Sequence, residues 1–193
     1  MAHDRQAAGP AEARAGTDLL GFEDYQLISR LKSAYFFALD TKDWGRLRSL
    51  FADDARFEGF PFASAGPDAF VGGVSAWLGR MRSVHHGMMP DLRSVSPDRA
   101  RGRWTMADYL TWEDPGFVYK GFPVPGMYGV RGYGYYDEEY VRNPRDGHWR
   151  ISFMRLTRLW IDPLRGDRTE PPPPYDVPAV RTDWLDGERT LGS

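Results

Sequence analysis

The segment WTMADYLTW, residues Trp104–Trp112, decides the fold, because its large apolar side chains fall on every second residue. Successive side chains of a strand point to opposite faces of a sheet, so this period of two predicts a strand with one face on the core. Asp108 falls on the same face as the apolar residues. A lone carboxylate there would lose its hydration at a large cost in free energy, so we expect Asp108 to be protonated, paired or at a cavity wall.

Other strand-like runs surround this segment and are separated by turn signals rich in Pro, Asp and Gly. The long strands are expected at about 84–95, 99–113, 127–141 and 148–161. Three glycines in the third of these runs indicate a bend or bulge, which would curve the sheet around a cavity.

The last run repeats the anomaly of Asp108. Arg155 falls in register with Trp149, Ile151 and Phe153, so a second charge lies on an apolar row. Two such charges suggest an apolar pocket with polar groups at one end. The alternative is a buried salt bridge between Asp108 and Arg155 across adjacent strands, which would explain both charges without any chemistry.

Helical periodicity comes before the long strands. Residues 23–39 carry apolar side chains at helical spacing without Gly or Pro. A short helix over 44–51, a brief strand over 55–60 and a third helix over about 67–82 follow, and Gly72-Gly73 weakens the third helix. Helices first and long strands afterwards predict an α+β fold with an antiparallel sheet.

The domain organisation follows from composition. A chain of 193 residues with 41% hydrophobic residues suits one core with extensions. Residues 1–20 have no sustained apolar period and are expected to form a mobile arm. The folded domain is expected over 21–162, and residues 163–193, with their run of four prolines, are expected to form an extended tail.

Composition also excludes several classes of function. The 25 Lys and Arg balance 27 Asp and Glu without a basic block, so nucleic acid is not an expected partner. No apolar run reaches the roughly 18 residues of a membrane helix and the N-terminus lacks a signal-peptide centre, so we expect no membrane association and a cytoplasmic protein. The absence of cysteine excludes disulfides and thiolate sites, and the four histidines show no metal-ligand spacing, so no metal is expected. Aromatic residues at 15% favour a large apolar cavity over a charged cleft.

The order of these segments resembles the SnoaL-like branch of the nuclear-transport-factor-2-like superfamily over about residues 22–161. The residues that carry the resemblance are Tyr35–Asp40, Asp43-Trp44, Leu50–Ala55 and Val84–Gly87. The resemblance implies a cone-shaped barrel, with three N-terminal helices packed on a curved antiparallel sheet. The chain looks most like the eliminating enzymes scytalone dehydratase, bile-acid 7α-dehydratase and hexachlorocyclohexane dehydrochlorinase. These imply an Asp–His pair in an apolar pocket, no cofactor, and a homodimer or homotrimer.

The resemblance also implies roles for single residues. Asp40 matches the aspartate that holds the catalytic histidine, Tyr35 matches a pocket tyrosine, and His85 rather than His86 matches the base. Asp108 corresponds in spacing to a second acidic residue. Arg155 lies near an arginine of the dehydrochlorinase, but Met154 or Arg158 could be its true equivalent.

The chemistry of these residue types agrees with an elimination. Imidazole titrates near working pH, which suits His85 as a base, and a carboxylate such as Asp40 fixes its tautomer. Asp108 could protonate a departing hydroxide if its apolar surroundings raise its pKa, with Tyr35, Tyr109 and Tyr119 as competitors. Arg155 would polarise a substrate carbonyl or carboxylate.

Structural roles are the alternatives at each position, because Asp40 could simply end a helix and His85 could be a satisfied core histidine. Our hypothesis is a cofactor-independent dehydratase acting on a bulky, apolar, hydroxylated cyclic substrate such as a steroid or polyketide. A cyclase or isomerase using the same pocket, and a non-catalytic protein that binds small molecules, are the alternatives. The residues expected to contact the substrate are Phe60, Trp104, Met106, Tyr109, Tyr119 and Phe153.

Overall fold

The computed structural model describes residues 19–62, 65–113, 118–119 and 122–166. Over these residues the chain forms three helices and seven strands. Their bounds in chain order are α1 (Phe22–Thr41), α2 (Trp44–Ser49), β1 (Phe51–Glu58), α3 (Pro67–Leu78), β2 (Arg82–Ser96), β3 (Arg99–Thr111), β4 (Val118–Tyr119), β5 (Phe122–Pro123), β6 (Met127–Arg142) and β7 (Trp149–Arg165). The expected order of helices followed by long strands is confirmed.

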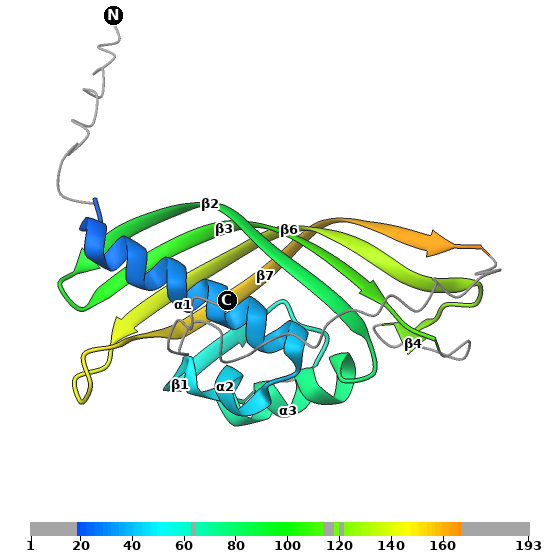
Figure 1. Cartoon of the computed structure of the whole chain (residues 1–193), viewed down its shortest axis with the longest axis horizontal. Coiled ribbons are helices and arrows are strands. Elements are labelled where there is room, and N and C mark those ends of the chain that lie inside the picture. Colours follow the sequence, from blue (N-terminus) through cyan, green and yellow to red (C-terminus); the bar gives the residue numbers. More distant parts are fainter. Residues whose placement is uncertain (1–18, 63–64, 114–117, 120–121, 167–193) are drawn as a thin grey trace, which may run out of the picture.

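Five strands form the main sheet in the order β1-β7-β6-β3-β2, and β4 pairs with β5 apart from it. Figure 1 shows the four long strands arching over the helices, with α1 lying along their inner side and α2 and α3 beside β1. The expectation of a purely antiparallel sheet is wrong at one edge, because β1 runs parallel to β7. The chain can make this parallel pair because the rest of the fold lies between the two strands in sequence.

The end of α1 determines where the site lies. The helix buries one stripe of residues that includes Ile28, Tyr35 and Leu39. It ends at Lys42, whose backbone is left-handed (φ 62°) and whose N–H caps carbonyls of the last turn. Asp43 then caps α2 by accepting a hydrogen bond from the Arg46 amide at 3.0 Å. This sharp change of direction leaves Asp40 in the last turn of α1, beside β2.

A bulge in β7 overturns the expected register of that strand. Ile151 pairs with Tyr140, but the next pair is Phe153 with Glu139, so one extra residue lies in β7. Because an extra residue turns every later side chain to the other face, Phe153 and Arg155 face outward. Residues Met154 and Leu156 take the buried positions instead.

The ends of the described fold differ slightly from the expected limits. Leu19 pairs with Arg93 in an isolated bridge, so the fold includes residues that were assigned to the N-terminal arm. Strand β7 continues to Arg165, beyond the expected limit of 162. Residues 1–18 and 167–193, which hold most of the expected arm and tail, lie outside the described residues. Of the helices in the described ranges, none combines the length and hydropathy that a membrane crossing needs.

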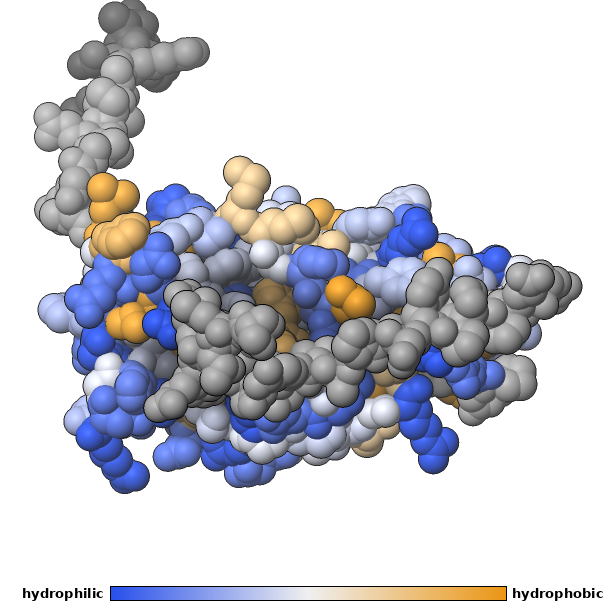
Figure 2. All heavy atoms as spheres, in the orientation of Figure 1, coloured by the Kyte–Doolittle hydropathy of each residue, from blue (hydrophilic) through white to orange (hydrophobic). Residues whose placement is uncertain are grey.

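The surface of the described residues is largely polar in the orientation of Figure 2, with apolar side chains in small groups. The core lies between α1 and the inner face of the sheet, and the aromatic side chains Tyr35, Phe51, Phe70 and Tyr140 are almost fully buried in it.

Candidate active site

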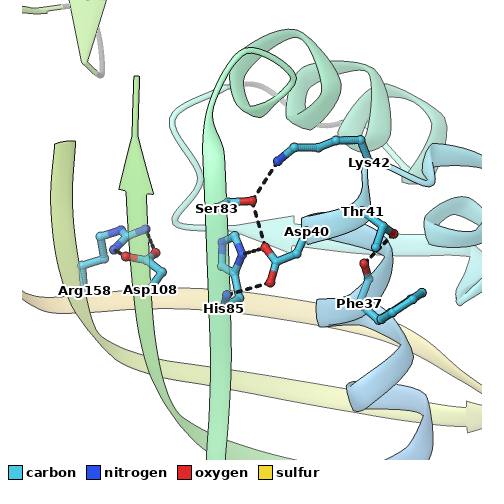
Figure 3. Close-up of polar contacts among 8 residues, drawn as sticks. All are labelled: Phe37, Asp40, Thr41, Lys42, Ser83, His85, Asp108 and Arg158. Atoms are coloured by element: carbon cyan, nitrogen blue, oxygen red, sulfur yellow. Dashed lines mark hydrogen bonds and ion pairs between the residues drawn. The ribbon is translucent and has the colours of Figure 1, made fainter. Parts of the chain in front are cut away.

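Asp40 and His85 are held together by several hydrogen bonds at the end of α1. One carboxylate oxygen of Asp40 lies 2.7 Å from Nδ1 of the His85 ring. The other oxygen accepts the backbone N–H of His85 at 2.8 Å. Ser83 donates to Asp40 at 2.8 Å and in turn accepts a hydrogen bond from Lys42 at 2.8 Å. Figure 3 shows this chain of contacts, which links the end of α1 to β2.

These contacts define the tautomer of His85. A carboxylate can only accept hydrogen bonds, so Nδ1 of His85 carries the proton that faces Asp40. The lone pair is then on Nε2, for which no hydrogen bond is found within the described residues. The His85 side chain is only 7% exposed, whereas the neighbouring His86 is exposed on the other face of β2. The geometry therefore singles out His85 rather than His86 as the histidine that faces the inside.

A glycine allows α1 to approach β2 this closely. The Phe36 ring stacks on the His85 ring, with centroids 6.4 Å apart and planes 12° apart. A side chain at Gly87 would overlap the Phe36 ring. The His-His-Gly motif thus combines an inward-facing imidazole with the space that its aromatic neighbour occupies.

A small apolar cavity opens beside His85. Its volume is about 30 Å³, which is room for about one water molecule, so a larger molecule could enter only if the walls move. Tyr35 and Phe60, two of the expected site residues, lie in its wall. The remaining lining residues are Leu39, Pro61, Phe62, Val74, Trp77, Leu78, Tyr136, Leu156 and Arg158.

Two buried tyrosines stand at this cavity. The rings of Tyr35 and Tyr136 meet edge-on at 6.0 Å, and their hydroxyl groups interact. Burial raises the pKa of both phenols, and nearby acidic groups raise that of Tyr35 further. Both are therefore neutral hydrogen-bond donors at neutral pH. Tyr133 and Tyr135 fall on the opposite face of β6 because side chains alternate along a strand.

Asp108 lies directly opposite His85 in the β2–β3 pairing and has a buried side chain. It forms a bidentate ion pair with Arg158, in which Nη1 donates at 3.0 Å and Nη2 donates to the second oxygen. The expected buried salt bridge exists, but its partner is Arg158 and not Arg155. Burial alone would lower the pKa of Arg158, but the hydrogen bonds and charge of Asp108 outweigh that effect and raise it.

Gly132 explains how this ion pair crosses a strand. Asp108 is on β3 and Arg158 on β7, with β6 between them. A side chain at Gly132 would overlap both Arg158 and Asp108. The glycine-rich run of β6 therefore provides the gap through which the two charges meet.

Three residues of the expected site lie away from it. Arg155 is half-exposed on the outer face and pairs with Glu58 at 2.8 Å. Phe153 packs beneath the Arg155 guanidinium at 5.3 Å, and Tyr109 contacts Arg131 on the same outer face. The bulge in β7 turns Phe153 and Arg155 outward. Tyr109 faces outward because it follows Asp108 directly on β3 and therefore points to the opposite face of the sheet.

The other three expected contact residues are buried but do not line the cavity. Trp104 donates its indole N–H to Tyr140 at 2.8 Å and borders a groove of about 650 Å³ between α1 and β2. Met106 lies in the core. Tyr119 packs between Trp77 and Trp112, on the far side of the cavity wall.

Sequence reasoning missed a second buried ion pair. Lys32 on α1 contacts Glu138 on β6, and both side chains are almost fully buried. Glu138 also accepts a hydrogen bond from Tyr140. The Lys32 ammonium lies 3.7 Å from the ring centroid of Tyr136 and 4.3 Å from that of Tyr35. Glu138 lies two residues from both Tyr136 and Tyr140 on β6, so all three side chains share one face of the sheet. This alternation is the sequence signal that could have revealed the burial of Glu138.

Within the described residues, no group of three His, Asp or Glu side chains is placed to hold a metal ion.

Three helices against a curved, mostly antiparallel sheet, with the site between them, define the nuclear-transport-factor-2-like fold. Residues 22–155 match the model of the SnoaL-like domain, and the chain belongs to this family. The resemblance seen in the sequence is therefore confirmed.

Solved structures support the same fold. The chain resembles a type 2 hexachlorocyclohexane dehydrochlorinase, LinA, with a TM-score of 0.64 and 24% identity over 78% of this chain and 95% of that one. It resembles LinA-type3 from Novosphingobium barchaimii LL02 with a TM-score of 0.61 and 25% identity over 78% and 96% of the two chains. A candidate scytalone dehydratase from Novosphingobium aromaticivorans DSM 12444 gives a TM-score of 0.58 and 20% identity over 75% and 89%.

Proposed function

We propose that this protein is a cofactor-independent lyase that removes water from a bulky, apolar, hydroxylated ring compound. The observation that carries the proposal is the pairing of Asp40 with Nδ1 of His85, which leaves Nε2 of a buried imidazole beside an apolar cavity. A base for carbon acids needs a free lone pair, a fixed tautomer and a carboxylate that stabilises the imidazolium as it forms. His85 and Asp40 meet these three needs.

The reaction balances with residues of this chain. His85 Nε2 takes a proton from carbon, the electron pair of that C–H bond forms a double bond, and the neighbouring C–O bond breaks. The departing hydroxide takes up a proton and leaves as water. The imidazolium then gives up its proton through solvent, and the group that protonated the hydroxide takes one back, so both residues return to their starting state.

Tyr35 and Tyr136 are better placed than Asp108 to protonate the leaving hydroxide. Both oxygens of Asp108 accept hydrogen bonds from Arg158, so this carboxyl acts as the partner of a cation and not as a proton donor. The two tyrosines line the cavity and are kept neutral by burial, and a contact between two hydroxyls uses only one of their two protons. The other proton can be donated to the substrate.

The size of the cavity makes opening part of the proposal. A ring compound needs several times the present 30 Å³, so part of the wall, such as the segment Phe60–Phe62 and the adjoining residues of α3, would have to move. The names of the similar proteins support an elimination on a small apolar molecule, since two are dehydrochlorinases and one is a candidate scytalone dehydratase.

The test is a screen of hydroxylated steroids and polyketide ketols for loss of water, followed by mass spectrometry. Once a substrate is found, His85→Gln should lower turnover by about 100- to 10,000-fold, the usual contribution of a general base. His86→Gln is the matched control and should behave like the wild type, because His86 is exposed on the other face of β2.

Other outcomes would redirect the proposal. A product of unchanged mass that depends on His85 would indicate an isomerase or cyclase. Tight binding without conversion of any compound would indicate a binding protein. Equal turnover in the His85 and His86 variants would rule out His85 as the base and end the proposal of an Asp40–His85 dyad.

A further inference from the structure

Lys42 lies at the end of α1 and directs its side chain back toward the candidate site. Its backbone is left-handed (φ 62°), and its N–H bonds to the carbonyls of Ala38 and Leu39. Its ammonium group donates a hydrogen bond to the Ser83 hydroxyl at 2.8 Å (Figure 3). Burial lowers the pKa of Lys42, and the charge of Asp40 opposes that effect. Lys42 therefore brings a partly buried positive charge close to Asp40, with Ser83 between them.

The hydrogen bonds from Lys42 to Asp40 run in one direction. An ammonium group can only donate, so the Ser83 oxygen accepts from Lys42 and the single Ser83 proton is left for Asp40. Ser83 donates to the Asp40 oxygen at 2.8 Å, and the same oxygen faces Nδ1 of His85 at 2.7 Å. Lys42 thus fixes the direction of the hydroxyl that supports Asp40, although it does not line the cavity beside His85.

The charges around His85 come from several elements, and most of them are balanced. The titratable groups that face His85 are Tyr35, Asp40 and Lys42 from α1, Asp108 from β3, Tyr136 from β6 and Arg158 from β7. Helix α3 contributes uncharged side chains to the cavity wall. The two phenols are neutral, and Asp108 neutralises Arg158. Lys32, which borders a groove together with His85, is neutralised by Glu138, and His86 points to the other face of β2.

Asp40 and Lys42 are therefore the two charges that decide how readily His85 takes up a proton from solvent. A carboxylate beside an imidazole stabilises the imidazolium, and a positive charge nearby destabilises it. A general base has to be neutral before it can accept a proton from a substrate. With Asp40 alone, His85 would be protonated over a wider range of pH and could not act as a base there.

We propose that Lys42 is a positioning residue of the Asp40–His85 pair, whose ammonium group opposes protonation of the imidazole and so keeps His85 free to act as a base. The proposal rests on the proposed function and deepens it, because it names the residue that sets the pH range in which the pair works. Lys42 has this effect without contact with the substrate, since it acts through Ser83 and through its charge.

The test follows the ring protons of His85 by NMR over about pH 5–9, which covers the titration of an imidazole. The His85 resonances are assigned by their loss in His85→Gln. Lys42→Gln keeps a donor for Ser83 but removes the charge. In this variant the midpoint of the His85 titration should rise by about 0.5–1 pH unit, the effect of one nearby charge at a high effective dielectric constant. Lys42→Arg keeps the charge and should titrate like the wild type.

Arg82→Gln is the matched control, because Arg82 directly precedes Ser83 on β2 but has a side chain that is 68% exposed and pairs with Glu113 at 2.9 Å. The variant removes the same charge from the outer face of β2 and should leave the midpoint unchanged. A wild-type midpoint in Lys42→Gln, or an equal rise in Arg82→Gln, would overturn the proposal. A Lys42→Arg variant that titrates like Lys42→Gln would also overturn it.

The proposed function is judged separately, because this titration needs no substrate. Turnover in His85→Gln tests the base and the midpoint in Lys42→Gln tests its neighbour, so each can fail without the other. Once a substrate is found, Lys42→Gln should lose more turnover at acid pH than at alkaline pH, a pattern that a loss of packing does not produce. A loss that is uniform across pH would count against the proposal.

Discussion

Asp40 holds His85 at two points, since one carboxylate oxygen contacts the imidazole and the other accepts the backbone N–H of the same residue. The ring cannot rotate without losing the first contact, and β2 cannot shift along α1 without losing the second. A single carboxylate therefore fixes both the orientation of the base and the position of its strand. Ser83 adds a third hydrogen bond to the same group.

This arrangement predicts a graded series of variants. Asp40→Asn should lower turnover by about 100- to 10,000-fold, because an amide can offer its NH₂ group to Nδ1 and stabilise the wrong tautomer. Ser83→Ala removes one hydrogen bond to the carboxylate and should lower turnover by only about 2- to 10-fold. Steady-state kinetics with thermal melting would check both, and a Ser83 effect as large as that of Asp40 would contradict the order.

Gly132 gives a prediction about the buried charges. A methyl group there would overlap Asp108 and Arg158, so Gly132→Ala should destabilise the fold by about 1–3 kcal/mol, as overpacking of a core usually does. Gly45→Ala in α2 is the control. Its new methyl group meets no atom closer than 3.9 Å, and it should be neutral or stabilising. Urea unfolding of the two variants would show whether the ion pair needs the gap.

Substitutions at two adjacent glycines of α3 should distinguish an effect on helix stability from an effect on the shape of the cavity. A methyl group at Gly72 meets nothing within 4 Å, so Gly72→Ala should stabilise α3 by up to about 1 kcal/mol. A methyl group at Gly73 would overlap the Phe62 ring, which lines the cavity. Gly73→Ala should therefore change the affinity for a small apolar ring compound such as indane, measured by calorimetry, and yield no comparable gain in stability. If both variants melt and bind alike, the packing of Phe62 on Gly73 does not shape the cavity.

Helix-capping residues and the alternation of side chains along a strand account for the parts of the fold that could be predicted from the sequence. Period and capping residues are local signals, and they predict α1, whereas the choice of Asp40 and of His85 over His86 comes from the family resemblance. The Asp108 anomaly on β3 was also visible, because no bulge interrupts β3 near it. These parts of the fold and site depend on residues close together in the chain.

The incorrect predictions concern side chains whose orientation depends on how one strand pairs with another. The bulge in β7 between Ile151 and Phe153 moves Arg155 outward and brings Arg158 inward, and a further register shift lies beyond Arg158, opposite Tyr133 and Gly134. Nothing in the sequence of β7 alone marks these extra residues, because they are defined by the pairing with β6. The alternation of side chains along β7 could therefore not show which arginine pairs with Asp108.

The buried ion pair of Lys32 and Glu138 should contribute much more to stability than the half-exposed pair of Arg155 and Glu58. Lys32→Met leaves Glu138 buried without its cation, so unfolding free energy should fall by about 3–5 kcal/mol. Arg155→Met removes one side of the half-exposed pair with Glu58 and should cost at most about 1 kcal/mol. Urea unfolding of both variants would check the contrast. Similar losses would mean that Lys32 is not an essential partner of Glu138.

The buried tyrosines predict a loss of stability in alkali. Burial raises the folded-state pKa of Tyr35, Tyr119, Tyr136 and Tyr140 above the ordinary value of 10.0. A raised pKa means that the folded state binds more protons, so this stability is fully present below pH 10 and is lost as pH rises through the folded pKa. Each group contributes a slope of up to about 1.4 kcal/mol per pH unit.

Two lysines act in the opposite direction. Burial lowers the pKa of Lys32 and Lys42 below 10.5. Their contribution to the free energy of unfolding therefore increases with pH up to 10.5 and is constant above it. Four tyrosines outweigh two lysines, and urea midpoints should fall above about pH 10.5. Tyr140→Phe should lower stability at neutral pH by removing the hydrogen bond to Glu138, and it should also flatten the alkaline slope. Tyr133→Phe, which removes an exposed phenol, should leave the slope unchanged, and an equal effect of the two variants would contradict burial as the cause.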